Sequence, residues 1–397
     1  MALEKFTIAR DDSVYECFPH RCRTTTGRIL LTYRESNGHV ASEFNRLIVR
    51  HSDDAGHTWS ERYVLRDEDR SNGPMNTWNG PKIQQLKDGR ILLTCDTYLF
   101  PPGEWGERVA NCHIVMWFSD DEGRTWSEPM HTSVKGICPD QVTEMPDGRW
   151  LLPSNVRSHQ TDLIVQNIST SRDGGQTWEA PYAIFDSSDH ELDEASIVLL
   201  PSGELVIYLR EDLGRPLQKM ISKDGGLTWE GPYDTLNPAA IGMPIAGLTQ
   251  DGLILITARF GLQCNWRVDM SEETWQQRIA RRTIVVPKVP NNDEMIARIQ
   301  PGPSILETDD EIVIGAGGSS VHTFAFIEPI ESALSGERSD QKGLLLPLDL
   351  DANNLGADSG YTGWVEYERG KFIVANYIND DAPLAQIRGY RFSLEDF

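Results

Sequence analysis

The chain has 397 residues, of which 24% are charged and 39% hydrophobic, and its formal net charge is −23 at pH 7. This acidic balance argues against nucleic acid or an anionic membrane as the main partner, because both bind basic surfaces. Its 33 Gly and 11 Trp are many, as in β-propellers whose blades each repeat a Gly and aromatic motif.

The amino-terminal segment, MALEKFTIARDDS, has no apolar stretch of the kind a signal peptide carries. No later stretch approaches the roughly 18 apolar residues of a membrane span. Six cysteines show neither a CxxC pair nor a Cys/His metal spacing: Cys17, Cys22, Cys95, Cys112, Cys138 and Cys264. We expect thiols in a cytoplasmic protein without metal or cofactor; the alternative is an exported protein whose signal peptide has been removed.

Two β-rich runs joined by a short turn recur along the chain. The five clearest copies span residues 22–34, 83–95, 142–154, 197–210 and 245–259, and two weaker copies span 305–317 and 364–377. The turns are Asp-Gly, Ser-Gly or similar pairs, which favour β-hairpins between such runs. Each copy therefore predicts two neighbouring antiparallel strands.

A second motif, Ser-x-Asp-x-Gly-x-Thr-Trp, follows four of these hairpins. Its copies are Ser52–Trp59, Ser119–Trp126, Ser171–Trp178 and Ser222–Trp229, with a decayed fifth at Ser271–Trp275. The Asp accepts hydrogen bonds from turn N–H groups, the Gly tolerates positive φ, and the Trp packs beside the turn. We expect each copy, called an Asp box below, to join the third and fourth strands of one four-stranded blade.

The number of hairpin copies predicts an all-β propeller with seven four-stranded blades. The alternative is six blades with an insertion near residues 300–345. In both cases the strand-like segment FTIAR near the amino terminus supplies the fourth strand of the last blade, which closes the ring and removes free edges. We treat residues 1–397 as one propeller domain.

Strand direction places the functional residues at the end of the ring opposite the Asp boxes. Hairpin turns and Asp boxes both follow odd strands, so the other end collects the segments before each first strand and after each second strand. The candidates from those segments are Arg34, Glu35, His39, Trp78, Asp140, Arg157, Glu194, Arg210, Arg259, Gln300, Asp358 and Tyr361. Arginine, carboxylate, His and aromatic side chains gathered at a propeller mouth suit an anionic or polyhydroxylated sugar.

The Asp boxes and hairpins resemble the sialidase (neuraminidase) superfamily over most of the chain. The segment from Glu194 to Arg210 resembles the sialidase segment that carries the glutamate supporting the nucleophile and one arginine of the carboxylate-binding triad. Ser359-Gly360-Tyr361, before a β-hairpin, resembles the segment that carries the tyrosine nucleophile. Sialidases use a tyrosine where most glycosidases use a carboxylate. The resemblance thus implies Tyr361 as nucleophile and Glu194 as its base.

Two positions depart from the sialidase pattern. Sialidases begin with Arg-Ile-Pro, whose Arg heads the triad, whereas this chain has Cys17-Phe18-Pro19. Near the place of the acid/base aspartate stands His39, whose ordinary pKa of about 6.5 suits proton transfer. A loop histidine bonded to backbone is the structural alternative for His39, and Glu35 is a second acid/base candidate.

Three hypotheses follow for function. The first is an exo-acting glycoside hydrolase on a terminal anionic or deoxy sugar, with Tyr361 and Glu194 as the nucleophile pair and His39 or Glu35 as acid/base. Its substrate would be held by Arg34, Arg210, Arg259, Arg157, Trp78, Asp140, Gln300 and Asp358. The second is a lyase on uronate-containing polysaccharides; related propellers that cleave such polysaccharides, by hydrolysis or by β-elimination, resemble this chain in using His and Tyr. The third is a non-catalytic carbohydrate-binding propeller.

Overall fold

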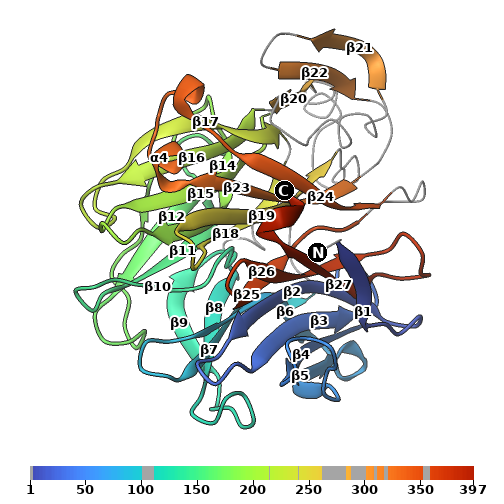
Figure 1. Ribbon diagram of the computed structural model, residues 1–397. Helices are drawn as coiled ribbons and strands as arrows, with labels where there is room; N and C mark the ends of the chain where they lie inside the picture. Colours follow the sequence, from blue (N-terminus) through green and yellow to red (C-terminus); the bar gives the residue numbers. More distant parts are fainter. Residues whose placement is uncertain are drawn as a thin grey trace.

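A computed structural model describes residues 3–100, 111–213, 215–239, 241–261, 283–287, 301–307, 311–316, 321–351 and 358–397. Six four-stranded antiparallel sheets stand around a common axis as the blades of a propeller (Figure 1). Within each blade the strands pair in order from the innermost to the outermost. The expected all-β propeller is therefore confirmed.

The first three blades follow one another along the chain. Blade one has β2 (Tyr15–Arg23), β3 (Ile29–Ser36), β4 (Phe44–Ser52) and β5 (Tyr63–Asp69). Blade two has β6 (Met75–Gln85), β7 (Ile91–Phe100), β8 (His113–Ser119) and β9 (Met130–Lys135). Blade three has β10 (Thr143–Glu144), β11 (Trp150–Arg157), β12 (Ile164–Ser171) and β13 (Tyr182–Ala183).

The last three blades contain the one interruption and the ring closure. Blade four has β14 (Leu192–Leu199), β15 (Leu205–Glu211), β16 (Pro216–Ser222) and β17 (Glu230–Ala239). Blade five has β18 (Ile241–Leu248), β19 (Leu253–Gly261), β23 (Val321–Pro329) and β24 (Leu344–Asp351). Blade six has β25 (Gly363–Glu368), β26 (Lys371–Ile378), β27 (Gln386–Ser393) and the amino-terminal β1 (Glu4–Ala9).

Short helices occupy a few connections. They are α4 (Ile330–Ala333) and the 3₁₀ turns Arg70–Asn72, Arg338–Asp340 and Leu394–Asp396. None of the helices in the described part of the chain is long and apolar enough to cross a membrane.

The prediction of seven blades is wrong, and the six-blade alternative is correct. The hairpin at 305–317 belongs to a separate three-stranded sheet of β20 (Thr283–Pro287), β21 (Pro301–Glu307) and β22 (Glu311–Ala316). This sheet is inserted between β19 and β23, which pair directly from Leu253↔Pro329 to Gly261↔Val321. The insertion expected near 300–345 therefore extends too far toward the carboxyl terminus, because β23, α4 and the start of β24 are part of blade five.

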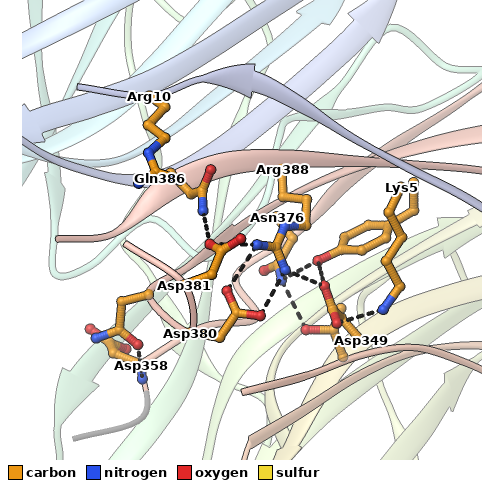
Figure 2. A network of polar contacts seen from close by, with 12 residues as sticks. Lys5, Arg10, Asp349, Asp358, Asn376, Asp380, Asp381, Gln386 and Arg388 are labelled. Atoms are coloured by element: carbon orange, nitrogen blue, oxygen red, sulfur yellow. Dashed lines mark hydrogen bonds and ion pairs between the residues drawn. The ribbon is translucent and has the colours of Figure 1, made fainter. Parts of the chain in front are cut away.

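The amino-terminal strand closes the ring as expected. β1 pairs antiparallel with β27, and Phe6 lies opposite Gly389. At the junction with blade five, Lys5 Nζ donates to Asp349 at 2.7 Å, and Arg388 of β27 donates to the same carboxylate at 2.8 Å (Figure 2). β1 and β27 are thus joined by a ladder, and both bind Asp349 of blade five.

The four described Asp boxes form the turns between third and fourth strands, as expected. In the second box Gly123 N–H donates to Ser119 Oγ at 2.9 Å, and Asp121 accepts from Thr125 N–H at 2.8 Å and Thr125 Oγ1 at 2.7 Å. The same bonds recur in the boxes that begin at Ser52, Ser171 and Ser222. The decayed copy at Ser271–Trp275 lies outside the described residues.

The core is divided among the interfaces between neighbouring blades. Between blades one and two, for example, Leu30 and Leu47 pack against Ile83 and Leu93. Between blades four and five, Val206 and Tyr208 pack against Ile256. Each sheet buries both of its faces in this way. Strands such as β7 and β26 are therefore buried along most of their length, rather than on every second residue.

Candidate active site

A bulge interrupts the innermost strand of four blades, always at the end opposite the Asp boxes. The strand pairings shift after Cys17 in β2, Asn79 in β6, Asp193 in β14 and Gly242 in β18. The next residue has positive φ in each case: Phe18 (58°), Gly80 (55°), Glu194 (42°) and Met243 (37°). Bulges next to active sites re-aim side chains, and strained φ values cluster at such sites.

Three arginines occupy equivalent positions beside these bulges. Arg34 pairs with Cys17, Arg210 with Asp193, and Arg259 with Gly242, each one residue before the bulge. Asp96 takes the equivalent place in blade two, opposite Asn79. The bulges and the residues facing them therefore form one ring of functional positions around the axis.

Tyr361 and Glu194 form the centre of the candidate site. Tyr361 Oη donates a hydrogen bond to Glu194 Oε1 across 167 residues of sequence. Arg210 Nη1 lies 3.0 Å from Glu194 Oε2, and Met243 N–H donates to the same oxygen at 2.6 Å. The Arg259 guanidinium lies 4.7 Å from the centre of the Tyr361 ring.

These contacts set the protonation of the pair. Burial raises the pKa of Glu194, but Arg210 and Arg259 and the bond from Tyr361 outweigh it, so this pKa lies below its usual value. Burial and the neighbouring Glu194 charge raise the pKa of Tyr361 well above 10. A protonated phenol therefore donates to an ionised carboxylate, which is the arrangement needed to remove the phenol proton as its oxygen attacks.

Two glycines make room for Arg259. A Cβ on Gly242 would collide with the Arg259 guanidinium, and a Cβ on Gly360 with the Arg259 stem. Gly360 also has φ +97°, which favours glycine. The Ser359-Gly360-Tyr361 sequence thus has a physical reason: Gly360 lets the chain pass over Arg259, which donates to Ser359 O at 3.0 Å.

A second polar group centres on Asp358. Its Oδ2 lies 2.7 Å from His39 Nδ1 and also accepts from Tyr15 Oη. Its Oδ1 accepts from Tyr377 Oη at 2.7 Å and lies 3.7 Å from Arg259 Nη1. Burial alone would raise the pKa of Asp358, but His39 and Arg259 lower it far below its usual value. Because an ionised carboxylate only accepts, His39 carries a proton on Nδ1.

Arg34 supports the loop that carries His39. Its guanidinium donates to Asn79 Oδ1 at 2.7 Å, to the Gly38 carbonyl at 3.3 Å and to the His39 carbonyl. It also lies 4.5 Å from the centre of the Phe18 ring, which in turn packs against His39 and Tyr361. Arg34 is 2% exposed, and its main contacts hold this loop in place.

Four other candidates take part in contacts away from the Tyr361–Glu194 pair. Glu35 follows Arg34 on β3, points to the other face of the sheet and binds Arg62 at 2.6 Å. Trp78 is 3% exposed and packs on Trp117 in the core between blades one and two, so it offers no open face for a sugar.

Asp140 and Arg157 are likewise held by protein groups. The buried Asp140 carboxylate accepts from Ile197 N–H at 2.9 Å and Ser196 Oγ at 3.0 Å, joining blade three to blade four. Arg157 pairs with Asp162 at 2.7 Å within its own hairpin. Gln300 lies outside the described residues.

The structure also brings in residues that the sequence did not single out. They are Tyr15, Phe18, Tyr377 and Met243, which touch Asp358, His39, Tyr361 or Glu194. A signal for two of them is present: Phe18-Pro19, Gly80-Pro81 and Met243-Pro244 each precede a hairpin and mark the bulge. Tyr15 and Tyr377 carry no local signal, because they meet only through ring closure.

No group of three or more His, Cys, Asp or Glu side chains suited to a metal ion occurs within the described ranges. Five of the six cysteines are buried thiols in those ranges, and Cys264 lies outside them.

Comparison with known proteins points to one family. Residues 47–280 match the model of the BNR repeat-like domain. A curated relative, a sialidase of Paraclostridium sordellii, is 25% identical over 206 residues, which are 47% of this chain and 49% of the relative. The match thus spans about half the length of that relative.

Solved structures share the fold over nearly the whole chain. A protein of unknown function from Dyadobacter fermentans superposes with a TM-score of 0.67 at 19% identity, covering 98% of both chains. A mutant Trypanosoma rangeli sialidase that displays trans-sialidase activity gives a TM-score of 0.62 at 12% identity, covering 98% of this chain and 59% of the other. At these identities the likeness concerns the fold.

Proposed function

The chain belongs to the family of BNR repeat-like domains within the sialidase-like superfamily of β-propellers, and from this premise we propose that it is an exo-acting glycoside hydrolase. The observation that carries the proposal is the bond from the Tyr361 phenol to Glu194, whose other oxygen lies 3.0 Å from Arg210. A buried phenol with its own ionised base is a nucleophile ready for covalent catalysis.

In the first step of the proposed reaction, Tyr361 Oη attacks the anomeric carbon of the bound sugar. The phenol proton passes to Glu194 as the new carbon–oxygen bond forms and the glycosidic bond breaks. His39, 26% exposed on its loop and held through Nδ1 by Asp358, gives the leaving oxygen a proton from Nε2. Arg210 and Arg259 stabilise the carboxylate and the developing phenolate charge.

In the second step water attacks the same carbon. His39 removes a proton from the water, the bond to Tyr361 Oη breaks, and Glu194 returns the proton to the phenol oxygen. Two displacements at one carbon retain its configuration. Because Asp358 is ionised and accepts from Nδ1–H, it holds the imidazole ring in position.

Action on a terminal sugar is supported by contacts across the axis. Lys82 of β6 lies in blade two and Met243 of β18 in blade five, which are opposite each other in a ring of six. Lys82 Nζ nevertheless lies 3.6 Å from Met243 Sδ and 3.0 Å from the Gly80 carbonyl. Side chains that meet across the axis close the passage at that level, so a chain end enters the site more readily than a chain middle.

Replacing Tyr361 by Phe tests the proposal. The variant lacks the attacking oxygen, so turnover of any glycoside that the wild type cleaves should fall by about 10³-fold or more. The matched control is Tyr63→Phe, which changes an exposed tyrosine of β5 and should keep full activity. Unchanged turnover in Tyr361→Phe would remove Tyr361 as the nucleophile.

A further inference from the structure

We propose that the sugar bound at this site is neutral, without a carboxylate on the ring that faces Arg210 and Arg259. The inference rests on the proposed function, which makes the ligand a sugar. It chooses between the two kinds of substrate that the sequence left open, anionic sugars and deoxy or other uncharged sugars. Its basis is that Arg210 and Arg259, the two arginines nearest Tyr361 and Glu194, already face carboxylates of the protein.

Arg210 is surrounded by carboxylates. Its Nε donates to Asp212 at 2.7 Å, its Nη1 lies 3.0 Å from Glu194, and Asp193 lies 3.8 Å from its Nε. A guanidinium binds one carboxylate side-on through a pair of N–H groups. With two acidic side chains at hydrogen-bond distance, Arg210 is saturated with negative charge before any ligand arrives.

Arg259 is matched in the same way. It is 4% exposed, and its Nη1 lies 3.7 Å from Asp358 and donates to Ser359 O at 3.0 Å. The flat face of its guanidinium covers the Tyr361 ring. Asp358, which also binds His39, is ionised and therefore compensates the positive charge of Arg259.

Arg34, the third arginine of the ring, binds only backbone and amide oxygens. Its contacts are Asn79 Oδ1 and the carbonyls of Gly38 and His39, and Phe18 covers its face. These contacts tie its N–H groups to the loop that carries His39. A ligand carboxylate would have to break them to bind Arg34 side-on.

Cys17 lies opposite Arg34 at the start of the bulge, in the segment that resembles the Arg-Ile-Pro of sialidases. It is fully buried, and burial raises the pKa of its thiol to about 12, so it is neutral. Cys17 therefore contributes neither a positive charge nor a fork of N–H donors. Of the three arginines, Arg210 and Arg259 face carboxylates of the protein, and the N–H groups of Arg34 are held by neutral oxygens.

Glu194 and Asp358 then determine whether the site prefers a charged or a neutral ligand. Both are ionised; Glu194 accepts from the attacking oxygen of Tyr361, and Asp358 binds His39. A ligand carboxylate beside either of them would meet like charge. Sugar hydroxyls, by contrast, donate to carboxylate oxygens and accept from guanidinium groups, so they satisfy both kinds of side chain.

The wild-type protein tests the proposal without any mutation. Calorimetry with neutral sugars (L-rhamnose, L-fucose, L-arabinose and D-galactose) is compared with N-acetylneuraminate and D-glucuronate, and turnover is measured on the matching aryl glycosides. We expect binding and turnover to be confined to neutral sugars. An anionic sugar bound ten times more tightly than every neutral one would overturn the proposal.

Asp358→Asn removes one negative charge with little change in shape. The affinity ratio of anionic to neutral sugars should rise by about tenfold, equivalent to ~1.4 kcal/mol. The matched control is Asp67→Asn on the outer strand of blade one, 57% exposed, which should leave the ratio unchanged. An unchanged ratio in Asp358→Asn, with binding retained, contradicts the role given to Asp358.

The outcomes separate this inference from the proposed hydrolase. Turnover of a sialoside that is lost in Tyr361→Phe keeps the hydrolase and rejects the neutral substrate. Neutral sugars that bind without turnover of any glycoside keep the charge preference and reject the catalysis. An unsaturated uronate product absorbing in the near ultraviolet, formed from a uronate polymer, rejects both.

Discussion

The buried side chain of Glu16 has an unusual protonation state. Glu16 of β2 is 2% exposed and lies opposite Glu35 in the strand pairing. Burial, and then the charge of Glu35, raise the pKa of Glu16 to about 8. Glu35 itself is paired with Arg62 at 2.6 Å, and Glu16 Oε2 is buried without a hydrogen-bond partner. Glu16 is therefore protonated at neutral pH in the folded protein.

Glu16→Gln should change how stability depends on pH. The folded-state pKa lies above the unfolded value, so the folded protein binds the extra proton and the wild type loses stability as pH rises from about 4.5 to about 8. The full loss is roughly 5 kcal/mol. Denaturant unfolding should show the variant equal to wild type at pH 5 and more stable at pH 9.

Glu43→Gln, an exposed change in the same blade, is the control and should leave the pH profile as in the wild type. A Glu16→Gln variant that loses stability to the same extent at both pH values would mean that Glu16 is ionised in the folded protein.

At the scale of elements, the Asp box and the bulge lie at opposite ends of a blade and have different roles. The Asp box holds the turn between the two outer strands at one end of the ring. At the other end, the bulge residues Phe18, Glu194 and Met243 contact Tyr361 or each other. Tight turns that repeat in sequence therefore identify the scaffold, and the less regular bulges carry the site.

Asp121→Ala should weaken the second Asp box. Burial raises the pKa of Asp121, but bonds from Thr125 and Ser119 together outweigh it and lower this pKa to about 2. The carboxylate is partly exposed, so its loss should cost only about 1 kcal/mol of unfolding free energy at pH 7. Since the folded pKa is below the unfolded one, this contribution is present above about pH 4 and disappears as pH falls toward 2.

The neighbouring exposed Asp120→Ala is the matched control, because Asp120 occupies a variable position of the box. Thermal unfolding of both variants at pH 7 and pH 3 measures the difference. Equal stability of the two variants at pH 7 would show that the bonds to Asp121 add nothing.

At the scale of the whole molecule, the ring depends on joining its two ends. β1 is the outermost strand of blade six and covers the edge of β27 (Figure 1). Tyr15 and Tyr377, which both bind Asp358, meet only because blade six packs against blade one. Ring closure therefore supports the fold and the orientation of His39 together.

Deletion of residues 1–9 should open the ring. The variant loses the ladder between β1 and β27 and exposes an unpaired strand edge, so we expect Tm to fall by about 10 °C or more and self-association to increase. The control is the double variant Glu4→Ala/Lys5→Ala, which keeps the strand and removes its ion pairs to Arg391 and Asp349. This control should lose about 1 kcal/mol or less. An unchanged Tm after deletion would show that β1 is dispensable.

Local sequence determined the hairpins, the Asp boxes, the closing strand and the gathering of Tyr361, Glu194, Arg210, Arg259, Asp358 and His39 at one end of the ring. These features follow from short patterns and from strand direction, which depend on neighbouring residues alone. The tertiary structure decided the number of blades, because the hairpin at 305–317 pairs with β20 whereas β19 pairs with β23.

Tertiary structure also decided the partners of each polar side chain. Trp78 became core, Asp140 a link between blades, and Glu35 a partner of Arg62, although their loops resemble those of the site residues. Asp358 became the support of His39 and the counter-ion of Arg259. The physical reason is that a propeller buries both faces of every blade, so a side chain's environment is set by the adjacent blade rather than by its own strand.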